Sequence, residues 1–84
     1  MTIRVETESG SKYILTQRNG QWWFMGGFQS GVLTKVKGTI EIGKPLSFDA
    51  LEEGIYGGLN EDLIFVQTSP IRNIVISSLL SDSQ

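Results

Sequence analysis

The sequence predicts an all-β protein: a small antiparallel barrel or sandwich of about six short strands with one long glycine-rich loop. Three observations support this fold class. Apolar and polar residues alternate along most of the chain, as in strands that bury one face. Turn-forming residues recur about every eight to twelve residues. Ten of the 84 residues are glycines, which tight turns favour.

The first part of the chain divides into three strands joined by tight turns. Residues 3–7 alternate and predict the first strand, and a Ser-Gly-Ser turn at residues 9–11 leads into the second. Residues 19–20 are Asn-Gly, which favours a type I′ hairpin turn because both residues tolerate positive φ. Residues 21–25, QWWFM, then return as the third strand, since aromatic side chains suit a pleated sheet.

The longest alternating pattern covers residues 32–42 and predicts the fourth strand. Gly38 falls in the middle of this pattern on the inward face, where a strand bends or a barrel turns a corner. The Gly-Lys-Pro sequence at residues 43–45 ends the strand, and residues 46–48 predict one short strand after it.

Residues 49–62, DALEEGIYGGLNED, break the alternation and are expected to form the long loop. The beginning of this segment could form one helical turn, with Asp49 as its N-cap and Gly54 as its stop. Loops of this length in compact domains are often functional. Two further strands are expected at residues 63–68 and 71–77, with a Ser-Pro pair interrupting them.

The length predicts a single β domain over residues 1–78, followed by a flexible tail at residues 79–84. Small domains often gain stability from other subunits, so we expect a homo-oligomer. The charged N-terminus predicts no signal peptide, and no stretch approaches the roughly 20 apolar residues of a membrane helix. We therefore expect a cytoplasmic protein that does not bind membranes.

Charge is distributed unevenly along the chain. Residues 1–44 contain six cations against three carboxylates, a net charge of +3, and residues 45–84 contain one cation against six carboxylates, a net charge of −5. The total of −2 lacks the cationic excess of a nucleic-acid-binding protein. Ordinary solvated surface charge explains this pattern, although local cationic patches remain possible in the first half.

The composition also excludes most catalytic machinery. The chain has no cysteine and no histidine, which rules out disulfides, the common structural zinc sites, histidine-based triads and thiol nucleophiles. The carboxylate pairs Glu52/Glu53 and Glu61/Asp62 are neighbours in the expected loop, where adjacent side chains point apart, so solvated charge explains them better than acid–base catalysis. We expect no enzyme activity, no metal and no cofactor.

The first candidate site lies in the segment WWFMGGF at residues 22–28. In a strand, Trp22 and Phe24 face one way, and Trp23 and Met25 face the other. Because a barrel buries only one face, the simplest arrangement puts Trp22 and Phe24 in the core and Trp23 and Met25 over a loop or at a subunit interface. The sequence leaves open which tryptophan faces the core.

The alternative is a ligand site in which an aromatic ring stacks on a flat ligand. Trp22, Trp23 or Tyr56 would supply the ring. Gly26 and Gly27 would let the backbone approach the ligand and offer unshielded N–H donors. Both arrangements hold if the pocket lies at a subunit boundary.

The second candidate site is the segment TSPIR at residues 68–72, at an expected strand-to-strand corner. Thr68 and Ser69 offer hydroxyls, and Arg72 offers a planar donor group suited to phosphate. In the alternative interpretation, the hydroxyls cap backbone groups of the corner and the arginine is an ordinary surface charge.

The order of segments ETESGSKYIL, a tryptophan-rich strand, IEIGKPLSF, a glycine loop and VQTSPIRNIVI resembles small uncharacterised bacteriophage proteins. In that group, an SGS-Y segment opens the chain and a TSP-I/V segment precedes the last strand. The resemblance implies a phage or prophage origin, with the protein acting in the host cytosol. It also implies a counter-defence role, either by binding a defence protein or by sequestering a signalling nucleotide.

Together these features predict a non-enzymatic binding protein that captures a small anionic or nucleotide-like ligand. Its site would combine the aromatic rings, the paired glycines and the hydroxyl and guanidinium groups named above. The alternative is a protein–protein inhibitor of a host defence complex, using Trp23, Met25 and the acidic loop. Single-stranded nucleic-acid binding is a third possibility, but it requires a cationic groove, and the acidic second half argues against it.

Overall fold

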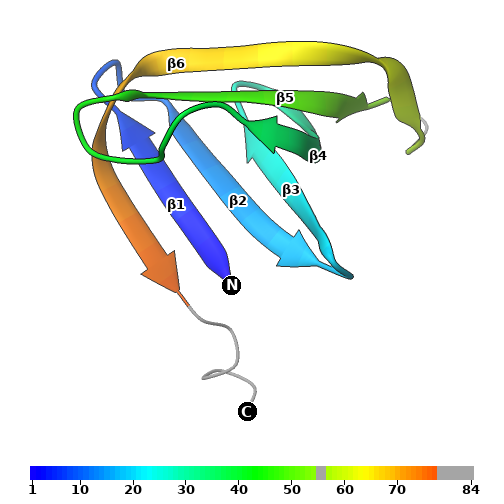
Figure 1. The fold of residues 1–84 in the computed structure, drawn as a ribbon, viewed down its shortest axis with the longest axis horizontal. Coiled ribbons are helices and arrows are strands. Elements are labelled where there is room, and N and C mark those ends of the chain that lie inside the picture. Colours follow the sequence, from blue (N-terminus) through cyan, green and yellow to red (C-terminus); the bar gives the residue numbers. More distant parts are fainter. Residues whose placement is uncertain (55–56, 78–84) are drawn as a thin grey trace.

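The computed structural model describes residues 1–54 and 57–77, and these residues confirm the predicted all-β fold. Six antiparallel strands follow one another in chain order around a closed barrel, as Figure 1 shows. The strands are β1 (Thr2–Thr7), β2 (Lys12–Arg18), β3 (Gln21–Gly26), β4 (Gln29–Val36), β5 (Pro45–Glu53) and β6 (Leu59–Ser77). In the part of the chain that the structure describes, no helix has the length and apolar character needed to cross a bilayer.

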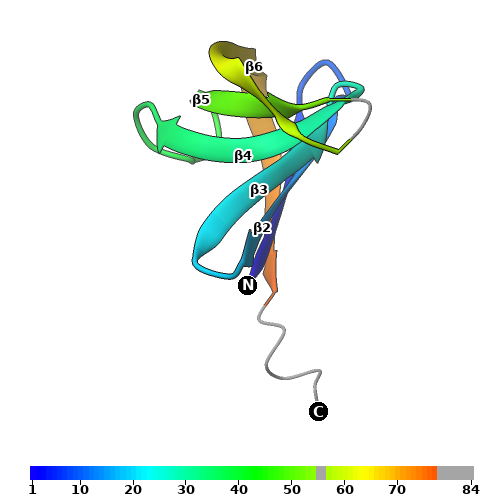
Figure 2. The ribbon, with the colours of Figure 1, turned by 90° about the vertical axis from the view of Figure 1, so that its right-hand side faces the viewer.

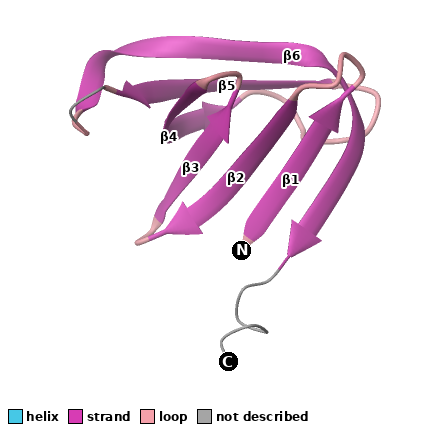
Figure 3. Cartoon of the chain, turned by 180° about the vertical axis from the view of Figure 1, so that it is seen from behind, coloured by secondary structure: helices cyan, strands magenta, loops and turns pink. Residues whose placement is uncertain are grey.

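The barrel closes through the long strand β6, which changes partner along its length. Its first part pairs with β5 as far as Pro70, opposite Pro45, and its second part pairs with β1 from Ile71, opposite Thr7. Figures 1 and 3 show the bend between these two parts. The corner lies where the sequence predicts it, but the predicted interruption is wrong, because Pro70 sits at the partner change, where a sheet tolerates a missing N–H donor.

β4 differs from the predicted fourth strand at both ends. It begins at Gln29 and ends at Val36, so Gly38 lies in the following loop, with φ of +77°, and not in the middle of a strand. The tight approach between strands occurs instead at Gly31, where any Cβ would overlap the carbonyl oxygen of Leu51 in β5. A glycine is therefore needed inside β4, but at a different position from the predicted one.

The predicted strand at residues 46–48 is present but longer, because β5 continues to Glu53, and the predicted helical turn after it is wrong. Leu51, in the middle of the expected helical turn, pairs with Val32 of β4 on one side and with Leu63 of β6 on the other. Hydrogen-bonded neighbours on both sides stabilise the extended conformation, and they override the weak local preference of DALEEG for a helix.

The expected loop at residues 49–62 is correspondingly shorter. β5 continues to Glu53 and β6 begins at Leu59, which leaves residues 54–58 as the connection. Residues 55 and 56 of this connection lie outside the described residues.

Buried side chains of five strands fill the inside of the barrel, and β4 adds the half-buried Leu33. Phe24 of β3 and Phe48 of β5 meet across the core with ring centroids 5.0 Å apart and a tilt of 58°, within the distance range that favours aromatic pairs. Figure 2 shows β4 and β5 crossing the direction of β2 and β3. The buried core cluster comprises Val5, Leu15, Phe24, Leu46, Phe48, Ala50, Val66 and Ile71.

Candidate ligand site at the barrel mouth

The alternation along β3 decides the orientation of the two tryptophans. Phe24 is buried inside the barrel, and Trp22, two residues before it, packs against the same core. Trp23 and Met25 lie on the outer face. The structure thus answers the question that the sequence left open: Trp22 faces the core.

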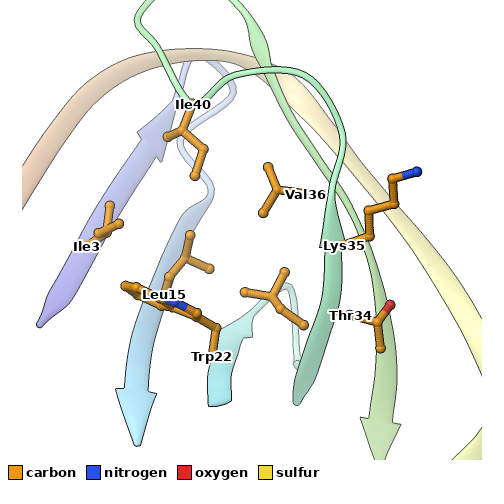
Figure 4. A pocket seen from close by; sticks show the side chains of 8 residues that line it. Ile3, Leu15, Trp22, Thr34, Lys35, Val36 and Ile40 are labelled. Atoms are coloured by element: carbon orange, nitrogen blue, oxygen red, sulfur yellow. The ribbon is translucent and has the colours of Figure 1, made fainter. Parts of the chain in front are cut away.

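Trp22 borders an apolar cavity of about 300 Å³ at one end of the barrel. This volume lies at the lower limit of the roughly 300–1,000 Å³ typical of ligand pockets. Figure 4 shows Ile3, Leu15, Trp22 and Ile40 converging on a common space from different segments. The complete lining is Ile3, Leu15, Trp22, Leu33, Thr34, Lys35, Val36 and Ile40.

A β-bulge in β4 keeps the positive charge out of this cavity. The pairing with β5 shifts between Leu33 and Lys35, so Leu33 lies opposite Ala50 on the inner face and Val36 lies opposite buried Phe48. The extra residue turns the intervening lysine outward, and in Figure 4 the amine of Lys35 points away from the cavity. The lining that faces the space is therefore almost entirely apolar.

The loop between β4 and β5 supplies the outer wall of the cavity. Its end is fixed to the corner of β6 by two backbone hydrogen bonds: Gly43 N–H donates to Ile71 O at 2.8 Å, and Ile71 N–H donates to Lys44 O at 2.9 Å. This attachment places the loop across the mouth, with Ile40 directed toward the cavity (Figure 4).

The paired glycines of the first candidate site lie beneath an aromatic ring. Tyr13 of β2 is opposite Gly26 of β3, and a Cβ built at Gly26 would lie 2.5 Å from Tyr13 Cδ2. A Cβ at Gly27 would lie 3.0 Å from the Tyr13 hydroxyl oxygen. The absence of side chains at these two positions makes room for Tyr13.

The hydroxyls of the second candidate site connect backbone segments at the corner of β6. Thr68 Oγ1 accepts a hydrogen bond from Leu46 N–H at 3.0 Å and donates to Ser69 O at 2.7 Å. Ser69 Oγ accepts from Ser9 N–H at 3.1 Å and donates to Ser9 Oγ at 3.1 Å. These contacts match the capping interpretation, and they join the SGS and TSP segments, which are 60 residues apart.

Arg72 is paired within the molecule. Its Nη2 donates to Glu6 Oε2 of β1 at 2.6 Å, and about half of the arginine side chain is exposed. The hydrogen bond from Arg72, together with its positive charge, holds the pKa of Glu6 below the usual value of 4.5. The partner is a strand residue next to the corner and not a residue of the acidic segment.

The outer face of the barrel has a small apolar layer of its own. Val32 of β4, opposite Trp23, is only 5% exposed although it lies outside the core cluster. The guanidinium carbon of Arg18 lies 4.7 Å from the centroid of the Trp23 ring, in cation–π contact with it. Met25, on the same face, is 61% exposed, and the expected interface at Trp23 and Met25 stays a prediction.

The structure brings together only part of the site expected from the sequence. Trp22 lines the cavity, whereas Thr68, Ser69 and Arg72 are not among its described lining residues. Tyr56 lies outside the described residues.

Sequence reasoning missed the contributions of Leu33, Val36 and Ile40 to the cavity. The alternation at residues 32–42 signalled buried side chains, but not the bulge and the loop that direct them to one space. Residues 1–54 and 57–77 contain no cluster of three or more acidic side chains that could hold a metal ion.

Comparison of the chain with protein-family models, with curated proteins and with solved structures finds no match. Statements about function therefore depend on the cavity and the side chains described above.

Proposed function

We propose that this protein is a binding protein that holds a small, flat and mainly apolar molecule at the barrel mouth, against Trp22. The observation that carries the proposal is the cavity of about 300 Å³ between this ring and the aliphatic side chains around it. An apolar cavity with an aromatic wall gains free energy when a ring or an aliphatic group replaces water in it.

The lining favours a different ligand class from the one the sequence predicts. An anion would need donors facing the cavity, but the amine of Lys35 points away from it (Figure 4). The expected anion-binding groups of Thr68, Ser69 and Arg72 contact Leu46, Ser9 and Glu6 instead. We therefore retain ligand capture as the function and replace the anionic ligand with an uncharged one. Phage origin and a counter-defence role stay predictions from the resemblance.

Calorimetric titration with indole and toluene as uncharged probes, and with cyclic and linear adenosine nucleotides as anionic probes, tests this proposal. We expect the uncharged rings to bind and the nucleotides to bind more weakly or not at all. In a heteronuclear NMR spectrum, the indole N–H signal of Trp22 should shift during titration while that of Trp23 stays in place. Tighter binding of nucleotides would overturn the ligand class, and the absence of binding by every probe would overturn the site.

A pair of valine substitutions provides the matched control. Val36 lines the cavity and is 40% exposed, and Val75, on β6, is 46% exposed and lies away from this cavity. Val36→Asp should weaken binding of the uncharged rings about tenfold or more, because a carboxylate beside the ligand loses hydration. Val75→Asp should leave that affinity unchanged. Equal effects of the two substitutions would place the ligand elsewhere.

A further inference from the structure

The turn between β3 and β4 exposes an aromatic residue in an unfavourable backbone conformation. Gly27 and Phe28 are its two central residues, with φ of +62° and +63°, as a type I′ turn requires. The left-handed region is unfavourable for an L-residue with a large side chain, and asparagine or glycine would fit the second position better. The Phe28 side chain is also fully exposed, so burial within this molecule does not offset the unfavourable φ.

An acidic and partly apolar hollow of about 350 Å³ adjoins this turn. Exposed Met25 contributes to its apolar part. Its carboxylates are Glu52, whose Oε2 accepts from Gln29 Nε2 at 3.4 Å, and Glu53, whose Oε1 accepts from Ser30 Oγ at 3.3 Å. The complete lining in the described part of the chain is Met25, Gly26, Phe28, Gln29, Ser30, Glu52 and Glu53, which includes two carboxylates and no basic side chain.

From this charge pattern we infer that the β3–β4 turn and the adjoining end of β5 form a docking surface for a basic segment of another protein. Phe28 and Met25 would contact apolar side chains or the stem of a lysine or arginine, and the Phe28 ring would also attract the cationic group. Glu52 and Glu53 would accept charge-assisted hydrogen bonds from that group. This surface is separate from the barrel mouth, so the inference is independent of the proposed ligand.

Charge also argues against other occupants of this surface. In a twofold-symmetric dimer, the same patch of each subunit faces the other, which would bring the carboxylates of the two copies together. An anionic membrane surface would repel the carboxylates in the same way. A basic protein segment satisfies both the apolar and the acidic parts of the hollow.

Selection of a random-peptide library on the immobilised protein, followed by affinity measurement of the enriched peptides, tests the inference. We expect a consensus that is rich in lysine or arginine and contains at least one large apolar residue. Phe28→Gly, and separately Glu52→Gln combined with Glu53→Gln, should each weaken binding about tenfold or more, as expected when charge-assisted or aromatic anchor contacts are lost. Phe65→Ala, at another exposed phenylalanine, and Glu8→Gln, at another exposed carboxylate, serve as matched controls and should bind like wild type.

A stability measurement separates docking from a structural role of the ring. Phe28→Gly should raise or maintain the melting temperature, because glycine fits positive φ better than phenylalanine, while peptide binding falls. A marked decrease in melting temperature would assign the ring to folding and overturn the inference. An acidic or uncharged consensus, no consensus, or wild-type binding by the variants would also overturn it. So would self-association of the wild type that Phe28→Gly abolishes in sedimentation, because a second copy would then occupy the surface.

Discussion

The ring of Tyr13 occupies the space that a side chain at residue 26 would need. The two residues lie opposite each other on β2 and β3, and a Cβ at Gly26 would approach Tyr13 Cδ2 to 2.5 Å and Lys12 O to 2.7 Å. This relationship explains why the sequence follows a cluster of large side chains with glycines: the large ring that needs the space comes from the neighbouring strand.

Gly26→Ala is therefore expected to destabilise the protein by about 1–3 kcal/mol, the usual cost of overpacking. Chemical denaturation of the variant and the wild type measures this difference. Gly58→Ala is the control, because a Cβ at Gly58 would meet no atom within 4 Å. A neutral Gly26→Ala would show that the Tyr13 ring and the backbone at Lys12 both move aside without cost.

Gly31→Ala should cost at least as much as Gly26→Ala, because its Cβ would meet backbone atoms of Leu51 and Glu52. All three of its nearest neighbours are backbone atoms of a paired strand, which cannot rotate away, whereas two of the three at Gly26 belong to the Tyr13 ring, which can shift. Substitution at this position is expected to loosen the contact between β4 and β5. Chemical denaturation of both variants shows which one loses more stability. A smaller loss of stability at Gly31 than at Gly26 would contradict the close approach of β4 and β5 described above.

Gly20→Val tests the turn between β2 and β3. Asn19 and Gly20 have φ of +52° and +79°, which confirms the positive φ at both positions predicted from the Asn-Gly pair. A β-branched residue at positive φ should cost about 1–2 kcal/mol or more. Gly20→Asn is the control, because asparagine tolerates positive φ and this variant should therefore lose less stability than the valine variant. Equal melting temperatures for the valine variant and the wild type would contradict the turn geometry.

The pair of Arg72 and Glu6 is expected to make stability depend on pH. The pKa of Glu6 is lower in the folded protein than its usual value of 4.5, so the unfolded chain binds a proton more readily. The contribution of this carboxylate is therefore fully present above that value and is lost as the pH falls through the lowered pKa. Arg72→Ala should remove this pH dependence. At neutral pH it should lower the free energy of unfolding only slightly, because exposed ion pairs contribute little to stability.

Denaturation curves of the wild type and Arg72→Ala at neutral and acidic pH measure this effect. The difference between the two proteins should shrink as the pH falls. In a Glu6→Gln background, which has no carboxyl group at residue 6, Arg72→Ala should produce no such pH-dependent difference. A difference that persists in that background would assign the role of Arg72 to another partner.

The sequence determined the fold class and the faces of several strands, because these depend on local rules. Alternation with a period of two put Trp22 and Phe24 on one face of β3 and Trp23 on the other, although it left open which of the two faces lines the core. The Asn-Gly pair identified a hairpin turn through its own backbone preferences. Where the conformation of a residue depends mainly on its neighbours in the chain, the sequence alone predicts it.

Tertiary structure decided the remaining features, because each depends on residues distant in the chain. β5 stays extended at Leu51 because β4 and β6 pair with it on both sides. Gly31 is required by the backbone of β5 and Gly26 by a ring of β2. The cavity beside Trp22 arises only when a bulge turns Lys35 outward and a loop held at Ile71 covers the mouth. Local sequence preferences specify neither the long-range strand pairing nor the shape of the space that the paired strands enclose.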